Sequence, residues 1–274
     1  DYSNQDSEKM PLFEIANTNF TRNEADNGHG IYIRGGSTTS LTVTDNCAFE
    51  DNGKDGTVIL SECNNLDVSS DTVFTYTNES DTTRPRPFDV AGNTDATFEN
   101  LVIENSLPSS KPNEGNALHF NSNVNYALVR NCTFRNCGNS GYVITFYCFV
   151  EFVNSKIIFD DPQNACKGLG IFTSQIVKVI NSSFTRSNNY DETDLGGGIY
   201  VDCTDNETLY NFDLDNVTFD ENYGTNNRCF RISWPIEFCH ATGVRIINSP
   251  RSGHTGAFYF KIKFMNKIQN ILKF

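Results

Sequence analysis

The chain has 274 residues, a formal net charge of −13 and a sequence pI near 4.7. This acidic balance argues against nucleic acid or an anionic membrane surface as a partner. The sequence contains no run of 18 apolar residues, so no membrane-spanning helix is expected. We expect a single domain that covers residues 1–274.

A short motif recurs from the start of the chain to its end. In each clear copy an Asn turn is followed three residues later by Phe, and then by an apolar strand that in most copies begins with Gly. The turn positions lie 23 to 35 residues apart, at 17, 46, 71, 100, 131, 154, 181, 216 and 248. Repeats of this length are typical of solenoids, because one unit can bury its apolar face only against the next.

The segments between the turns have the pattern of strands. Apolar and polar residues alternate in 41–44, 177–180 and 212–214, as in a half-buried strand. Helical periodicity is almost absent, and Leu does not recur at the fixed spacing of a leucine-rich solenoid. We therefore predict an all-β chain, a right-handed parallel β-helix of roughly nine coils and on the order of 40 Å in length.

Asn tolerates the left-handed backbone conformation that a sharp corner needs. We predict that one corner of successive coils is formed by Asn46, Asn131, Asn181 and Asn216. If strand alternation resumes after the corner, the first and third residues beyond it share a face, as Cys47 and Phe49 would. The inner face should then hold a file of rings, formed by Phe49, Phe134, Phe184 and Phe219.

A stack of parallel coils has two open ends that need covers. Residues 1–12 are a candidate for one cap. Residues 264–274 have apolar positions at helix-like spacing, and they are either the second cap or another coil cut short. Loops leaving the rod, where a recognition surface would lie, are expected in three polar stretches, at 78–87, 106–114 and 187–194.

Nine cysteines are many for a cytosolic enzyme, and none forms the C-x-x-C pair of a zinc site. The cysteines indicate either an oxidised secreted protein with several disulfides or a core in which Cys acts as a small apolar residue. For Cys47 and Cys132, on the expected inner face, we favour a buried thiol. Disulfides are predicted for the cysteines near strand ends, namely Cys148, Cys166, Cys203, Cys229 and Cys239.

Six N-x-[ST] sequons occur, at Asn19, Asn78, Asn131, Asn181, Asn206 and Asn216. The Asn, Ser and Thr content alone would produce about this number, so the count is no evidence for glycosylation. Asn78 and Asn206 lie in polar loop sequence, where a glycan could be carried without cost to packing. At the corner, an internal ladder of hydrogen bonds between the amides would exclude a sugar.

The motifs themselves indicate a family. An F-x-x-N motif occurs at 20–23, 49–52 and 219–222, and Gly197, Gly198 and Ile199 form a G-G-[AILV] motif. These features resemble the repeats of chlamydial polymorphic outer-membrane proteins and of related β-helical surface proteins from protists and bacteria. The likeness covers about residues 13–260, although the units near Asn100 and Asn154 lack both motifs. It implies an extracellular β-helix with an adhesive or structural role, and it identifies no ligand.

A carbohydrate-active enzyme is the alternative, since many polysaccharide lyases and hydrolases are β-helices. Fragments that resemble the polygalacturonase signature occur at 28–30, 93–95, 160–161 and 261–263. Their order differs from that family, and His29 in the first fragment is several coils away from the others. Glycoside hydrolysis needs two carboxyl groups within about 5–10 Å of each other, which such spacing does not provide.

The other polar groups give no clear site. Acidic pairs such as Asp160 and Asp161 follow no calcium-loop spacing, and the four histidines are isolated. We therefore expect no cofactor, no metal and no catalytic residue. Our interpretation is a non-enzymatic, extracellular structural or adhesive β-helix of a cell surface or surface appendage. Its expected partners are further copies of itself, surface proteins or glycans.

Overall fold

The structure is a computed structural model. It describes residues 12–25, 28–54, 56–69, 71–76, 83–92, 94–108, 114–138, 140–161, 166–173, 176–189, 197–202, 209–224, 229–232, 236–248 and 258–260. The candidate caps at 1–12 and 264–274 lie outside these ranges, except for Leu12. Within the ranges the chain forms strands and no helix.

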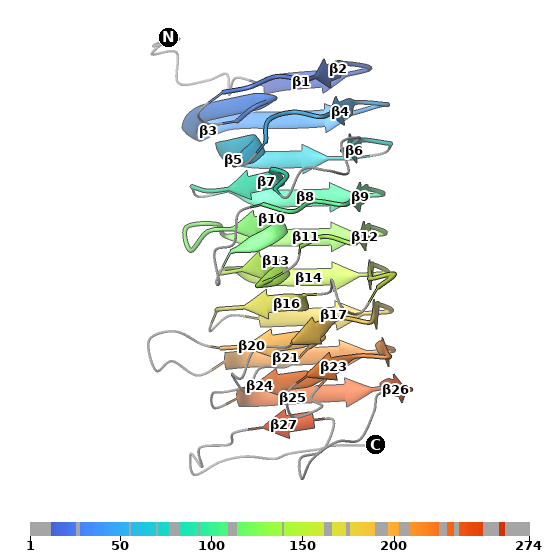
Figure 1. The fold of residues 1–274 in the computed structure, drawn as a ribbon. Coiled ribbons are helices and arrows are strands. Elements are labelled where there is room, and N and C mark those ends of the chain that lie inside the picture. The colour runs from blue at the N-terminus through green and yellow to red at the C-terminus, as the bar shows by residue number, and fades with distance from the viewer. Residues whose placement is uncertain are drawn as a thin grey trace.

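The chain is a parallel β-solenoid, as predicted (Figure 1). The long strands β3 and β5 each begin on one face of the rod and end on another, so a single 16-stranded sheet forms two long faces. A nine-stranded sheet of short strands closes the third side. Each strand of the short sheet belongs to one repeat of the sequence motif. All the strand pairs are parallel, so each coil continues the next in the same direction.

The first face contains β1 (Leu12–Ala16), the end of β3 (Ile31–Thr44), the end of β5 (Thr57–Val68), β8 (Asp95–Glu99), β11 (Tyr126–Arg130), β14 (Phe149–Val153), β17 (Ile176–Ile180), β21 (Leu209–Asp215) and β25 (Ile236–Thr242). The second face contains the starts of β3 and β5, β7 (Arg86–Val90), β10 (Gly115–Phe120), β13 (Tyr142–Phe146), β16 (Lys167–Ile171), β20 (Ile199–Val201), β24 (Phe230–Ile232) and β27 (Phe258–Phe260).

The corner sheet contains β2 (Asn19–Thr21), β4 (Ala48–Glu50), β6 (Val73–Thr75), β9 (Val102–Glu104), β12 (Thr133–Arg135), β15 (Lys156–Ile158), β18 (Ser183–Thr185), β22 (Thr218–Asp220) and β26 (Arg245–Ile247). A two-stranded sheet pairs β19 (Asn188–Asn189) with β23 (Tyr223–Gly224).

The corner before the corner sheet has the predicted left-handed backbone. The φ angles lie between 48° and 64° at Asn17, Asn46, Asp71, Asn100, Asn131, Asn154, Asn181 and Asn216. Their amides continue the ladder between coils; the N–H of Asn181, for example, donates to the carbonyl of Asp215 at 2.8 Å. The four corner residues predicted from the sequence are therefore confirmed.

A second corner follows the corner sheet, and the sequence analysis missed it. It also has left-handed residues, with φ between 51° and 58° at Arg22, Asp51, Asn105, Asn136, Arg186, Glu221 and Asn248. The assignment of Asn248 to the first corner was therefore wrong. In that coil Gly243 (φ 62°) takes the first corner, because Gly adopts positive φ without strain.

The file of rings runs along the corner sheet. Register pairs place Phe20, Phe49, Phe74, Ile103, Phe134, Ile157, Phe184, Phe219 and Ile246 one above the other. The four predicted members are at most 1% exposed. Rings in neighbouring coils stack, with centroids 4.8 Å apart for Phe49 and Phe74 and 5.2 Å apart for Phe184 and Phe219. This prediction is confirmed.

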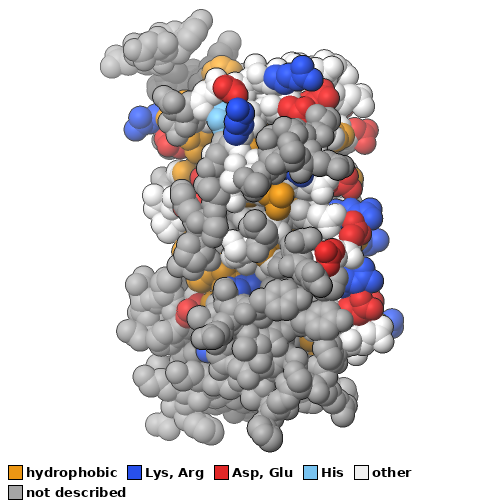
Figure 2. Space-filling model, viewed as in Figure 1, with side chains coloured by type: hydrophobic (Ala, Val, Ile, Leu, Met, Phe, Trp, Pro, Cys, Tyr) orange, Lys and Arg blue, Asp and Glu red, His pale blue; other side chains and the backbone are white. Residues whose placement is uncertain are grey.

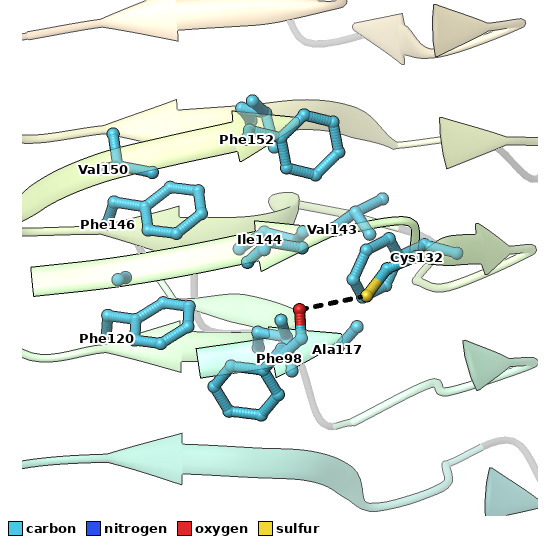
Figure 3. Packing of buried hydrophobic residues seen from close by; sticks show 14 of the residues in the cluster. Phe98, Ala117, Phe120, Cys132, Val143, Ile144, Phe146, Val150 and Phe152 are labelled. Atoms are coloured by element: carbon cyan, nitrogen blue, oxygen red, sulfur yellow. Dashed lines mark hydrogen bonds between the residues drawn. The ribbon is translucent and has the colours of Figure 1, made fainter. Parts of the chain in front are cut away.

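The long faces bury further rings between them. Figure 3 shows Phe98 and Phe152 from the first face next to Phe120 and Phe146 from the second. The thiol of Cys132 lies inside this core and donates to the carbonyl of Phe98 at 3.5 Å. One hydrophobic core therefore runs through the rod.

The Asn of the F-x-x-N motif is a buried bridge between coils. Asn222 accepts a hydrogen bond from the N–H of Ser187 and donates one to the carbonyl of Phe184, both at 2.8 Å. Asn52 makes the same pair of bonds, to the N–H of Asn23 at 3.0 Å and the carbonyl of Phe20 at 2.8 Å. The motif is thus explained by packing, since its Phe enters the file and its Asn joins two coils.

Candidate functional site

The two long faces differ in how far their outer sides are buried. On the first face, strands such as β11, β14 and β17 alternate buried and half-buried residues. On the second face, β10, β13 and β16 are buried at every position. The outward side chains of the second face are therefore enclosed, and this is where polar groups gather away from solvent. We use the name second-face cluster for these polar groups and the aromatic rings beside them, namely Arg86, Asp89, Glu114, His119, Thr145, Tyr142, Lys167, Phe172 and Tyr200.

One half of the second-face cluster is built around Arg86, whose side chain is 6% exposed. Its Nη1 lies 3.2 Å from an oxygen of Asp89, and its Nη2 lies 2.7 Å from an oxygen of Glu114. Its Nε donates to the carbonyl of Gly115. A buried guanidinium needs such partners, because an unpaired buried charge is costly.

His119 and Thr145 extend this half along the rod. Asp89, His119 and Thr145 face each other on consecutive strands. The Nδ1 of His119 shares a hydrogen bond of 2.7 Å with the Thr145 hydroxyl, which also accepts the N–H of Gly115 at 2.9 Å. The Thr145 side chain is fully buried, so this order of acid, imidazole and hydroxyl lacks the accessible nucleophile of a hydrolase triad.

The other half of the cluster is aromatic. Tyr142, Phe172 and Tyr200 pack together, with the Tyr142 and Phe172 centroids 5.6 Å apart. The Nζ of Lys167 lies 5.1 Å from the centroid of the Tyr142 ring. Burial raises the pKa of Tyr142, so its phenol stays protonated and is no general base at neutral pH. The Tyr200 hydroxyl donates to Asp202 at 2.8 Å.

The residues of the polygalacturonase-like fragments are not brought together. His29 accepts a hydrogen bond from the N–H of Ala25 in the first coil. Asp160 forms two bonds of 2.8 Å with the guanidinium of Arg135 at the second corner, several coils away. Residues 93 and 261–263 lie outside the described ranges. The fragments therefore make no site.

The disulfide prediction is corrected. Cys148, Cys166 and Cys229 are buried free thiols, and Cys239 is a half-buried free thiol, while Cys203 lies outside the described ranges. The physical reason is their orientation: residues near the strand ends still point into the core. Burial raises the pKa of Cys239 to about 11 and that of Cys148 further. The buried thiols expected at Cys47 and Cys132 are confirmed.

The corner amides do form a ladder, but on the outside of the rod. Asn131 donates to Asn100 at 3.1 Å, and Asn216 donates to Asn181 at 2.9 Å, with all four side chains exposed. The ladder is therefore not internal, and it does not by itself exclude a sugar. Of the other sequons, Asn19 is exposed on β2, and Asn78 and Asn206 lie outside the described ranges. Glycosylation stays a prediction.

Two of the expected loops are shorter than the sequence indicated, because residues at one edge of each stretch belong to the rod. Arg84 and Ser106 are buried, and β7 begins at Arg86, inside the stretch predicted as a loop. In the third stretch, β19 pairs with β23. The middle parts of the three stretches lie outside the described ranges.

In the described part of the chain, no group of three or more His, Cys, Asp or Glu side chains could hold a metal ion. Within the same ranges, nothing helical has the length and apolar character needed to cross a bilayer. No family model, curated protein or solved structure gives a significant match to the chain. The residues and their geometry therefore carry the functional argument.

The sequence analysis missed the second-face cluster. A signal for it was present in the sequence, because Asp89, His119 and Thr145 occupy the same outward position in three successive repeats. Aligning these strands by their inward residues, Phe88 and Leu118 for example, would have shown polar groups stacked on one line.

Proposed function

We propose that the chain is a non-enzymatic structural or adhesive rod of a cell surface or surface appendage. The observation that carries the proposal is the continuous file and core, which join every described coil to the next. A protein built in this way resists bending and holds surface groups at fixed spacing, which is what a scaffold or adhesin requires.

Surface charges support the same role, because many of them join neighbouring coils. Lys178 lies 2.8 Å from Glu151, Arg135 lies 2.8 Å from Asp160, and Arg186 pairs with Glu221 at 2.5 Å. Figure 2 shows basic and acidic side chains alternating along the edge where the corner sheet lies. Exposed pairs are individually weak, yet a line of them favours one stacking register.

An extracellular location is proposed on the resemblance of the repeats to surface proteins and on the acidic composition. The thiols are compatible with an oxidising medium. Burial raises the pKa of Cys132 and Cys137 to about 12, and a buried, protonated thiol reacts slowly with oxidants.

Antibody labelling of source cells tests the location. We expect the signal on intact cells, and a signal that requires permeabilisation would contradict the proposal. A screen for release of reducing ends or unsaturated sugars from acidic polysaccharides tests the absence of activity. We expect no release above that of the heat-denatured chain.

A carbohydrate-active enzyme is the second candidate, and one observation favours it. Asp89 and Glu114 come from adjacent coils and contact the same guanidinium. This arrangement brings two carboxylates close together, which glycoside hydrolysis requires. Both are ion-paired with Arg86, however, so neither is presented as a free acid. If turnover is found, loss of activity in Asp89→Asn and Glu114→Gln would assign it to this pair.

A further inference from the structure

Three of the sequons lie on one edge of the rod, at the first corner. Asn131, Asn181 and Asn216 have exposed side chains and a left-handed backbone, with φ between 48° and 55°. Parallel pairing of the strands that follow them stacks these corners one above the other, with Asn154 between the first two. Successive corners are therefore about 4.8 Å apart, and the three sequons form a line on the outside of the rod.

Each of these asparagines is followed two residues later by a hydroxyl residue that faces outward. Thr133, Ser183 and Thr218 are half-buried, and each precedes a buried Phe of the corner sheet. None of the three hydroxyls forms a hydrogen bond within the described residues. The same column holds Ala48 and Val102 in other coils. The fold therefore does not require a hydroxyl at this position, whereas the N-x-[ST] sequon does.

The buried asparagines show the opposite pattern. Asn52, Asn116 and Asn222 are at most 4% exposed, and none of them is followed two residues later by Ser or Thr. Their amides bond to the backbone inside the rod, as Asn222 does to the carbonyl of Phe184 at 2.8 Å. Among the described residues, sequons thus occur only where a bulky sugar would stay in solvent.

We propose that Asn131, Asn181 and Asn216 carry N-linked glycans, so that a line of sugars covers the first corner from the coil of β12 to the coil of β22. The inference rests on the proposed extracellular location, because sequons are modified in secreted chains. In the reaction, Nδ2 of the Asn forms a bond to the first carbon of an oligosaccharide carried on a lipid diphosphate. The bond from that carbon to the diphosphate breaks, the lipid diphosphate leaves, and Nδ2 loses one proton.

The ladder of corner amides is compatible with this modification. Asn131 donates one N–H to Asn100 at 3.1 Å, and Asn216 donates one to Asn181 at 2.9 Å. An Asn amide has two N–H donors. The glycosidic bond replaces one of them, so the other remains for the ladder. Asn181 takes part through its oxygen, which the sugar does not use. Each of the three residues can therefore carry a glycan and keep its contact with the neighbouring coil.

Analysis of the protein isolated from source cells tests the assignment. Peptide N-glycosidase in heavy-oxygen water converts each sugar-bearing Asn to an isotopically labelled Asp, which mass spectrometry locates. We expect label at Asn131, Asn181 and Asn216, and none at Asn100 or Asn154, which occupy the same corner without a sequon. Label at fewer than two of the three sequons, or label at the two control positions, would overturn the assignment. The surface role would still stand in that case if antibody labels intact cells.

Matched variants of the full chain, secreted from a eukaryotic cell line, test the corner position itself. Lys156→Thr creates a sequon at Asn154, whereas Lys156→Val fills the same exposed site without creating one. We expect Lys156→Thr to add one glycan, seen as a glycosidase-sensitive shift in gel mobility, with unchanged secretion, and Lys156→Val to add none. Thr133→Ala should remove one glycan and leave the corner Asn131 in place. A Lys156→Thr chain that gains no sugar or is retained in the cell, or unchanged mobility of Thr133→Ala, would overturn the proposal.

Discussion

The buried Asn of the F-x-x-N motif stabilises the fold through its hydrogen bonds to the backbone of the neighbouring coil. Asn222 is 1% exposed and satisfies one N–H and one carbonyl of the preceding coil. Asn222→Ala would leave both groups buried and unpaired. We expect a loss of about 2–4 kcal/mol in the free energy of unfolding, from the cost of two unsatisfied groups, measured by urea titration. Asn19→Ala, at an exposed position in β2, should cost less than about 0.5 kcal/mol.

The residues that occupy this position in other coils predict which replacements of Asn222 are tolerated. Ser106, Cys137 and Ser187 stand where Asn52 and Asn222 stand in their own coils, directly after the second corner, and all are buried. Asn222→Ser should therefore cost less than Asn222→Ala. If the two variants were equally stable, hydrogen bonding would not be what the position selects.

Cys137 makes stability depend on pH in the alkaline range. Burial raises the pKa of its thiol to about 12, whereas the unfolded thiol titrates near 8.5. The folded state therefore keeps its proton where the unfolded state loses it. The stabilisation is complete below about pH 8.5 and is lost as the pH rises toward 12.

The matched variant is Cys137→Ser, since Ser already occupies this position in two other coils. Between pH 9 and 11 the unmodified chain should lose about 1.4 kcal/mol more stability per pH unit than the variant, the slope of one proton. Urea midpoints at pH 8, 9.5 and 10.5 measure the difference. Parallel curves for the two proteins would show that Cys137 is not the group responsible.

At the scale of strands, the Gly-led strands and the ring file are one packing unit. A Cβ built on Gly198 would lie 2.6 Å from the ring of Phe219, and one on Gly168 would lie 2.9 Å from the ring of Phe184. Gly is needed here because the second face approaches the file closely, and not for a special backbone angle. The G-G-[AILV] motif at 197–199 is therefore packed against the Phe of the F-x-x-N motif at 219–222.

Gly198→Ala tests this packing. We expect a loss of about 1–3 kcal/mol from overpacking. Phe219→Leu removes part of the ring and should relieve the clash, so that the double variant loses less than the sum of the two single variants. Chemical denaturation of the four proteins gives the coupling energy. A coupling energy near zero would mean that another contact, such as the one to the carbonyl of Cys229 at 2.8 Å, limits the space.

The residues that stack from coil to coil could be predicted from the sequence better than the side-chain contacts around them. Asn181 and Phe184 could be placed because each feature repeats with the coil and has one structural cause. Asn248 was misplaced because two corners five residues apart both favour a left-handed residue, and Gly243 can fill the first of them. Arg86 and Glu114 could not be paired, because their contact depends on the register between β7 and β10, which no local pattern encodes.

For the solenoid as a whole, the stability lost when a core side chain is truncated should depend on where its coil lies along the rod. Each coil contacts only its neighbours, so stability is a sum of coil and interface terms. Phe134 lies in the middle of the file and is fully buried, with Ile103 and Ile157 on either side. Phe20 lies in the first coil, is half-buried, and stacks on Phe49 alone at 4.7 Å.

Phe134→Ala should therefore cost about 3–5 kcal/mol and lower the midpoint of the main unfolding transition. Phe20→Ala should cost less and act locally, because the first coil can fray while the rest stays folded. Hydrogen exchange read by mass spectrometry separates the two. The Phe20 variant should gain exchange in 12–25 only, and the Phe134 variant along the whole rod. If both variants gained exchange everywhere, the rod would unfold as one unit, and its stability would not be a sum of separate coil and interface terms.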